Sequence, residues 1–325
     1  MKAVNLFIFS FKMNQYFKYI FYIVLFLLAL IYSLNISLIY IYNNTFEGQS
    51  GGKINNLIKN YSRVNILSVG DSRCAKHINP TILGANNYNL SHNGQSLIFH
   101  TGLLDQIIKN EKIKIDTILL NLDIDELTYS SKKKEFDINR LKYYYNKNTW
   151  INEKINSLSW KEKYKFWVPL YIWNGNVLSI ISNYFFKTQV SKDGFTPTLE
   201  SDMDSINVSW ELKKIANKNL KERIYSVNIK TCNYLKHIQS ICEKNKIQLI
   251  CYISPTFNQL KISESNKEKV ISFFFDNKIK LFDYSNEFYN NKEFRNIWNW
   301  SDAFHLNERG AIIFSNKIRQ DLNNL

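Results

Sequence analysis

Two short polar blocks near opposite ends of the chain have residue types suited to nucleophilic chemistry. Gly70–Ser72 (GDS) follows a short apolar run, and Ser301–His305 (SDAFH) precedes the last helical pattern of the chain. A nucleophilic serine needs a base within hydrogen-bond reach, and that base needs a third group to fix its tautomer. An aspartate three residues before a histidine can supply the third group. Ser72, Asp302 and His305 are therefore the candidate catalytic residues.

The pattern around these blocks predicts an α/β fold with a parallel sheet. Short apolar runs alternate with segments whose apolar residues recur at helical spacing. We expect strands at about 65–69, 88–90, 117–122, 248–253 and 280–282, and helices at about 96–109, 225–242, 267–275 and 307–322. Strands that alternate with crossover helices form parallel sheets covered on both faces, and ligands bind at the carboxyl ends of the strands. Ser72 lies at such an end.

The alternation breaks between about residues 127 and 223, which we interpret as an aromatic-rich insertion. It is uncharged from Trp167 to Phe186, but asparagines, a proline and a glycine make that stretch too polar to be a second membrane span. The insertion is either a lid or sugar-stacking surface, with Trp167 and Trp173 as candidate substrate contacts, or a local core. It contains five of the seven tryptophans: Trp150, Trp160, Trp167, Trp173 and Trp210.

The N-terminal segment predicts a membrane anchor. No charged residue lies between Lys18 and Glu47, and residues 19–42 are mostly apolar. A helix of this length can span the hydrocarbon of a bilayer, and no small-residue cleavage site follows as in a signal peptide. The expected divisions are a cytoplasmic N-terminus (1–18), an anchor (19–42), a linker (43–60) and an extracytoplasmic domain (61–325). The orientation rests on the lysines that precede the anchor.

Composition limits the partners. The net charge is +14, and removing the three N-terminal lysines leaves 39 basic against 28 acidic residues, a charge of +11, for the rest. Because no nucleic-acid-binding motif accompanies this excess, we expect no nucleic-acid partner. The basic excess is explained either by an anionic envelope surface as partner or by a generally lysine-rich composition. The four cysteines form no CxxC pair and the five histidines have no metal-ligand spacing, so we expect no metal and no cofactor.

Taken together, the blocks resemble the SGNH/GDSL hydrolase superfamily. The resemblance rests on Gly70–Arg73 with Ile78–Pro80 downstream, on Gly94 after the second strand, and on Asp302–Ala311 before and into the last helix. It covers roughly residues 60–125 and 225–325, and is strongest with the membrane-anchored bacterial branch. That branch is related to D-alanyl transfer proteins and to polysaccharide O-acetyltransferases of the cell envelope. The α/β-hydrolase alternative is disfavoured because Cys74 occupies the second glycine of its G-x-S-x-G motif.

The resemblance implies a three-layer α/β/α, flavodoxin-like fold and assigns roles within it. Ser72 would be the nucleophile, His305 the base and Asp302 its orienting acid, with the backbone N–H groups of Ser72 and Gly94 in the oxyanion hole. The family's G-x-N-D block supplies an asparagine to that hole, but the matching stretch here is Asn121–Ile124.

That stretch places Asp123 where the family has its asparagine. Asn121 or Asp123 is then the candidate for the third oxyanion position, and Asn93 and Asn89 are substitutes. An ionised carboxylate repels an oxyanion. Arg73 would steer an anionic substrate or pair with a carboxylate.

The implied activity is that of a membrane-anchored extracytoplasmic serine esterase or O-acyltransferase. Its substrates would be acyl esters of cell-envelope glycans or polymers, and a multispanning acyl exporter would be a partner. The alternative is a non-catalytic envelope protein that keeps the fold for binding or assembly. The remaining residues able to do chemistry have structural interpretations: we expect His77, His92, His100 and His237 to be structural and Cys74 to be a packing residue, with a reactive thiol there left open.

Overall fold

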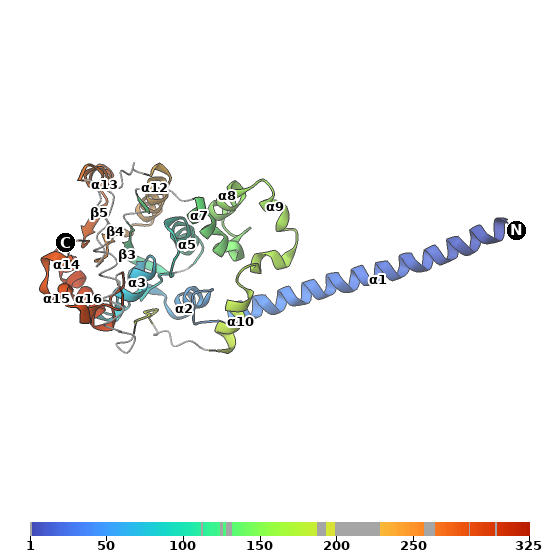
Figure 1. Ribbon diagram of the computed structural model, residues 1–325, viewed down its shortest axis with the longest axis horizontal. Helices are drawn as coiled ribbons and strands as arrows, with labels where there is room; N and C mark the ends of the chain where they lie inside the picture. Colours follow the sequence, from blue (N-terminus) through green and yellow to red (C-terminus); the bar gives the residue numbers. More distant parts are fainter. Residues whose placement is uncertain are drawn as a thin grey trace, which may run out of the picture.

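The computed structural model describes residues 2–325 except 112, 124–125, 128–131, 187–192, 199–227, 257–263, 286 and 303. Within this part of the chain, five parallel strands form one sheet in the order β2-β1-β3-β4-β5 (Figure 1). Its strands are β1 (Arg63–Val69), β2 (Tyr88–Asn89), β3 (Lys114–Asn121), β4 (Gln248–Ile253) and β5 (Lys280–Asp283). The predicted parallel sheet is therefore confirmed.

Helices pack against both faces of the sheet. Alternate residues of a strand point to opposite faces, so Ile118 and Leu120 of β3 enter one hydrophobic cluster and Leu119 enters the other. The first cluster contains residues of α2 (Gly52–Asn60), α5 (Leu97–Asn110), α12 (Ile229–Lys244) and α13 (Glu264–Asp276). The second contains residues of α3 (Ser72–His77), α4 (Pro80–Leu83), α15 (Lys292–Arg295) and α16 (Glu308–Asn323).

The predicted elements agree with the observed ones to within a few residues. The strand predicted at 248–253 is observed with the same bounds, while β1 and β3 begin two and three residues earlier than predicted. The expected linker at 43–60 differs: it contains α2, whose Ile54 and Leu57 are buried in the first cluster. Its apolar residues lie at i and i+3, a spacing too short to stand out among the surrounding polar residues.

A single long helix, α1 (Lys2–Asn43), projects from the body (Figure 1). In the described residues, the stretch Gln15–Asn43 is the one helix long and apolar enough to cross a membrane. Its side chains are exposed from Tyr16 to Leu34, apart from the half-buried Ile31. The last turns of α1 contact the body.

Residues 136–186, which we call the aromatic segment, pack between the end of α1 and α5. The segment packs on α5 through η1 (Phe136–Tyr144) and α8 (Thr149–Leu158), and on α1 through η2 (Pro169–Trp173) and α10 (Val177–Phe185). Trp210 and residues 199–223 of the expected insertion, and Tyr225 of the expected helix, lie outside the described residues. The short helix α7 (Lys132–Glu135) precedes the segment, and α9 (Glu162–Lys165) lies between α8 and η2 in the chain.

Candidate functional site

Ser72 lies at the carboxyl end of β1, at the start of α3. Asp71 is the N-cap of this helix, and its carboxylate accepts a hydrogen bond from the Arg73 backbone N–H at 2.9 Å. Gly70 makes the turn possible, because its φ is +156° and a Cβ there would lie 2.5 Å from the Cβ of Asn121. The strand, the glycine turn and the cap together place the half-buried Ser72 hydroxyl at the edge of the sheet.

The side chains of Ser72, His305 and Asp302, which we call the serine site, form a continuous hydrogen-bonded chain. The Ser72 Oγ lies 2.8 Å from the His305 Nε2. The His305 Nδ1 lies 2.8 Å and 3.0 Å from the two Asp302 carboxylate oxygens. Because a carboxylate only accepts, Nδ1 carries the proton and Nε2 is left to accept from the serine hydroxyl. This arrangement suits general-base activation of Ser72.

Asp302 is held as a carboxylate in this position. Its Oδ1 also accepts the backbone N–H groups of Phe304 and His305, at 2.7 Å and 2.9 Å. Burial alone would raise the pKa of Asp302, but the His305 hydrogen bond and charge and these two N–H groups lower it below its usual value. Asp302 therefore stays ionised at neutral pH and can keep the imidazole oriented.

The loop that carries His305 is closed by its own backbone. The Ser301 N–H donates to the His305 carbonyl at 2.9 Å, and Trp300 and Leu306 form an antiparallel bridge. Asn307 then caps α16 by accepting the Gly310 N–H at 3.0 Å. The loop is thus fixed between a buried tryptophan and a helix start, which explains how a short block presents Asp302 and His305 in register.

His77 supports this loop from α3, a role that the sequence did not reveal. Its ring is fully buried, and its Nε2 accepts the Leu306 backbone N–H at 2.9 Å. Burial, with the charges of His305 and Arg73, lowers the pKa of His77 well below its usual value, so it remains a neutral acceptor. The helix that begins with Ser72 therefore also holds the His305 loop, through residues five apart on α3.

Arg73 pairs with two carboxylates beside Ser72. Its guanidinium lies 2.9 Å from Asp71 and 3.2 Å from Asp123. Burial would raise the pKa of Asp71, but the Arg73 charge and hydrogen bonds lower it to about 2. Of the two roles expected for Arg73, the pairing with carboxylates is observed, and it offsets the negative charge of Asp123 near the site.

The turn expected to complete an oxyanion hole is tied to the turn of Ser72. The His92 backbone N–H donates to the Gly70 carbonyl at 2.9 Å, which joins the two turns. Gly94 follows in the left-handed region, with φ +67°. Behind it, the buried Lys53 donates from its amine to the Ser91 carbonyl at 3.0 Å, and burial lowers the pKa of Lys53 to about 8. This internal lysine was not recognised in the sequence.

The asparagines proposed as substitute donors make structural hydrogen bonds. Asn121 donates to the Ser254 hydroxyl at 3.1 Å. Asn89 donates to the carbonyls of Cys74 and Ile78, at 2.9 Å and 2.8 Å, and so holds the end of α3. Asn93 is exposed and donates its backbone N–H to Gln49.

The cysteine and the other histidines singled out in the sequence are buried or half-buried. Burial raises the pKa of Cys74 to about 12, so its thiol stays protonated. His237 pairs with Asp105 at 2.7 Å, whereas both ring nitrogens of the buried His100 lack a hydrogen-bond partner. Among the residues that the structure describes, no group of three metal-ligating side chains is found.

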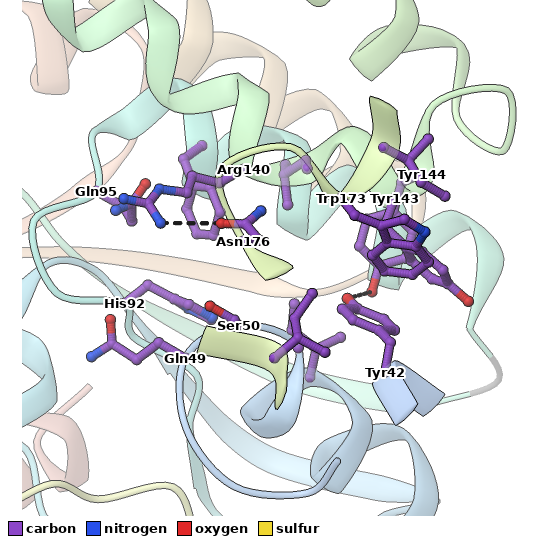
Figure 2. A pocket seen from close by; sticks show the side chains of 16 residues that line it. Tyr42, Gln49, Ser50, His92, Gln95, Arg140, Tyr143, Tyr144, Trp173 and Asn176 are labelled. Carbon is purple, nitrogen blue, oxygen red and sulfur yellow. Dashed lines mark hydrogen bonds between the residues drawn. The ribbon is translucent and has the colours of Figure 1, made fainter. Parts of the chain in front are cut away.

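Trp167 and Trp173 differ in environment. Trp167 is 79% exposed, while Trp173 is 1% exposed and donates its indole N–H to Asn35 of α1 at 2.8 Å. Trp173 lines a pocket of about 60 Å³ between α1 and the aromatic segment (Figure 2). His92 and Gln95, on either side of the Gly94 turn, form the opposite wall. This volume holds a few water molecules, so the pocket is a seam between packed elements.

Comparison of the chain with protein-family models and with curated proteins gives no match. The function therefore has to be argued from the geometry of the site. That geometry comprises a serine on a glycine turn, a histidine of defined tautomer and an ionised aspartate, at the carboxyl edge of a parallel sheet.

Proposed function

We propose that this protein is a membrane-anchored serine esterase or O-acyltransferase of the SGNH/GDSL type, with a three-layer α/β/α fold. The observation that carries the proposal is the hydrogen-bonded chain from Ser72 through His305 to Asp302. Neither block alone would support it, since a serine in a turn and an Asp-x-x-His sequence are both common. Their meeting across 233 residues of chain supports a shared chemical role.

In the acylation step, the Ser72 Oγ attacks the carbonyl carbon of an acyl ester while His305 Nε2 takes the hydroxyl proton. The imidazolium is stabilised by Asp302. Collapse of the tetrahedral intermediate breaks the ester C–O bond, and His305 returns the proton to the leaving alcohol. Water or a glycan hydroxyl then attacks the acyl-enzyme in the same way, which distinguishes hydrolysis from transfer.

The oxyanion would be stabilised mainly by backbone donors. As the first residue of α3, Ser72 has an N–H without an acceptor inside the helix, and the Gly94 N–H is the second candidate. Asp123 cannot donate when ionised, but the Arg73 guanidinium at 3.2 Å offsets its charge. Arg73 therefore has an electrostatic role here: it keeps the site permissive for a developing negative charge.

The substrates we propose are acyl esters of cell-envelope glycans or polymers, outside the cytoplasm. The lysines before the apolar stretch of α1 support a cytoplasmic N-terminus, and the basic excess of the remaining chain suits an anionic envelope. A multispanning acyl exporter would supply the acyl group in a transferase. The substrate contacts proposed here do not include Trp173, since its indole is committed to Asn35.

The test uses the full-length chain in detergent with a fluorophosphonate probe and an aryl acetate. We expect labelling and turnover in the wild type, loss of both in Ser72→Ala, and retention of both in Ser157→Ala, an exposed serine of α8. Mass spectrometry should find the acyl adduct on the peptide that contains Ser72. Equal labelling of wild type and Ser72→Ala would rule out the proposal.

The second candidate is a non-catalytic envelope protein that keeps this fold for binding or assembly. Asp123, in the position where the family has an oxyanion-stabilising asparagine, favours it. This alternative predicts no probe labelling of the wild type, together with glycan binding that Ser72→Ala leaves unchanged. Turnover that depends on His305 would exclude it.

A further inference from the structure

Large apolar side chains are exposed in two stretches of the aromatic segment, residues 160–168 and 178–186. Leu178 of α10 is 83% exposed and Trp167 is 79% exposed. Large exposed apolar surfaces on a protein mark sites of protein–protein or membrane interaction. We call this group the exposed apolar surface; it comprises Trp160, Trp167, Val168, Leu178, Phe185 and Phe186.

This surface belongs to the elements that hold the base of α1. One stripe of α1, at residues 35, 38, 39 and 42, is partly or fully buried and packs on the aromatic segment. Asn35 accepts the Trp173 indole N–H, and Tyr42 lies against the rings of Tyr143 and Trp173, at centroid distances of 4.1 Å and 5.6 Å (Figure 2). These contacts fix the direction in which α1 leaves the body.

The uncharged part of α1 outside these contacts is long enough to cross most of the hydrocarbon of a bilayer. Between Lys18 and Asn35 the helix is uncharged and, apart from Ile31, exposed, and these 16 residues at 1.5 Å each span about 24 Å. The contacts with the body begin where that length ends. If α1 spans a membrane, α9, η2 and α10 therefore lie at the level of the lipid headgroups, and Figure 1 shows α9 and α10 on the side from which α1 emerges.

The residue types of this surface suit a membrane interface. Tryptophans concentrate at the headgroup level, because their rings are apolar and their N–H groups are polar. The exposed Lys161, Lys163 and Lys165 flank the surface on α9, and long basic side chains at this depth reach anionic headgroups. Glu162, on the same helix, is paired with Lys165 at 2.6 Å.

We propose that the exposed apolar surface is inserted in the headgroup region of the bilayer that α1 spans, with the flanking lysines on anionic lipids. The partner is the lipid bilayer, and the inference rests on the membrane anchor of the proposed function. Two attachments, the spanning helix and this surface, hold the body in one orientation and keep the serine site at a fixed height above the membrane. Trp167 then contacts lipid, which accounts for an exposed tryptophan outside the serine site.

The test places nitroxide labels on the full-length chain in vesicles of phosphatidylcholine and phosphatidylglycerol. Cysteines are introduced by Leu178→Cys and Trp167→Cys, and the four native cysteines are buried and leave labelling to the new sites. The matched control is Trp298→Cys in η4 (Ile297–Asn299), 52% exposed and beside α15 and α16, at the end opposite α1 (Figure 1). We expect accessibility to lipid-dissolved oxygen, relative to an aqueous nickel chelate, to be several-fold higher at 167 and 178 than at 298.

Equal accessibility at positions 167, 178 and 298 would overturn the inference. Labels that become mobile and water-accessible when the chain is diluted in lipid would indicate that a second copy covers the surface, and would also overturn it. A label at Leu28→Cys in α1 separates the two proposals. If the label at position 28 lies at hydrocarbon depth while those at 167 and 178 are in water, only the proposal for the exposed apolar surface is contradicted. If the label at position 28 is itself in water, the membrane anchor is contradicted. Probe labelling of Ser72 reports catalysis independently of both.

Discussion

The serine site and the aromatic segment are both assembled from residues far apart in the chain, but they differ in what specifies the assembly. Ser72 and His305 are separated by 233 residues and Trp173 and Asn35 by 138. The serine site depends on two short blocks, each with its own turn and cap. The contacts of the aromatic segment depend on which side of each ring meets α1, and no local pattern sets that.

This difference shows what a parallel sheet contributes to a site. The carboxyl ends of parallel strands lie at one edge of the sheet, where ligands bind. Ser72 follows β1 and therefore lies at this edge, whatever the length of chain between Ser72 and His305. No comparable rule of sheet topology places the side chains of the aromatic segment. Trp167 and Trp173 are six residues apart, yet one is exposed and the other buried against α1.

Substitutions of His305 and Asp302 should have the largest effect on activity. His305→Ala should lower kcat for an aryl acetate by roughly 10⁴-fold, because it removes the base. Asp302→Asn should lower it by roughly 10³-fold, because the amide no longer fixes the Nδ1–H tautomer. Steady-state kinetics measure both effects. Thermal unfolding should change little, since the Asp302 side chain is 39% exposed; a large loss of stability would make the loop structural rather than catalytic.

Much of the fold and of the serine site could be predicted from the sequence, for a physical reason. Buried parallel strands are short apolar runs, and the caps Asp71 and Asn307 lie beside the residues that they position. His77 and Lys53 could not be assigned roles, because each bonds a backbone group, of Leu306 and Ser91, that only the tertiary fold brings near.

The aromatic segment shows the same limit of prediction from sequence. Its composition indicated either a lid or a local core, and parts of it are core: Trp150 and Ile151 pack with α5 in the first hydrophobic cluster. The contact of Trp173 with Asn35 was not foreseen, because an asparagine within an apolar helix gives no indication of its partner. Periodicity predicts which face of a helix is buried, but not which distant ring covers it.

The next largest effect should come from Arg73. Arg73→Gln leaves the Asp71 and Asp123 carboxylates without their cation beside the nucleophile, so kcat should fall by roughly 10²-fold while KM changes less. The double variant Arg73→Gln/Asp123→Asn removes one of the two negative charges that Arg73 offsets and should recover about a tenth of wild-type kcat or more. If the double variant is no better than the single one, the role of Arg73 is to hold the α3 turn and not to balance charge.

Glu126, which contacts the start of α5, should give a pH-dependent effect on stability. Its carboxylate accepts the Leu97 N–H at the start of α5, and burial raises its pKa to about 7. Because the folded-state pKa lies above the unfolded value, this group stabilises the fold at low pH, and that contribution is lost as pH rises through about 7. Glu126→Gln should remove the loss, by on the order of 2 kcal/mol between pH 5 and pH 8. Denaturant unfolding at both pH values measures it, and an equal change at both would refute the raised pKa.

The smallest expected effect tests the junction of α1 with the aromatic segment. The Tyr143 hydroxyl donates to the Asn43 side chain at 2.8 Å, and Tyr143→Phe removes this bond while keeping the ring against Tyr42 and Trp173. The junction should open more easily by about 1 kcal/mol, roughly a fivefold increase in amide hydrogen exchange at Asn44.

Tyr145→Phe is the matched control for this junction. It removes a similar bond, from the Tyr145 hydroxyl to Asn156 at 2.9 Å, but one that lies within the aromatic segment. Exchange at Asn44 should then stay at the wild-type rate, while exchange in α8 increases. If both variants loosen Asn44 equally, α1 and the aromatic segment open as one cooperative unit. The contacts of Trp173 and Tyr42 would then stabilise the segment itself as well as fix the direction of α1.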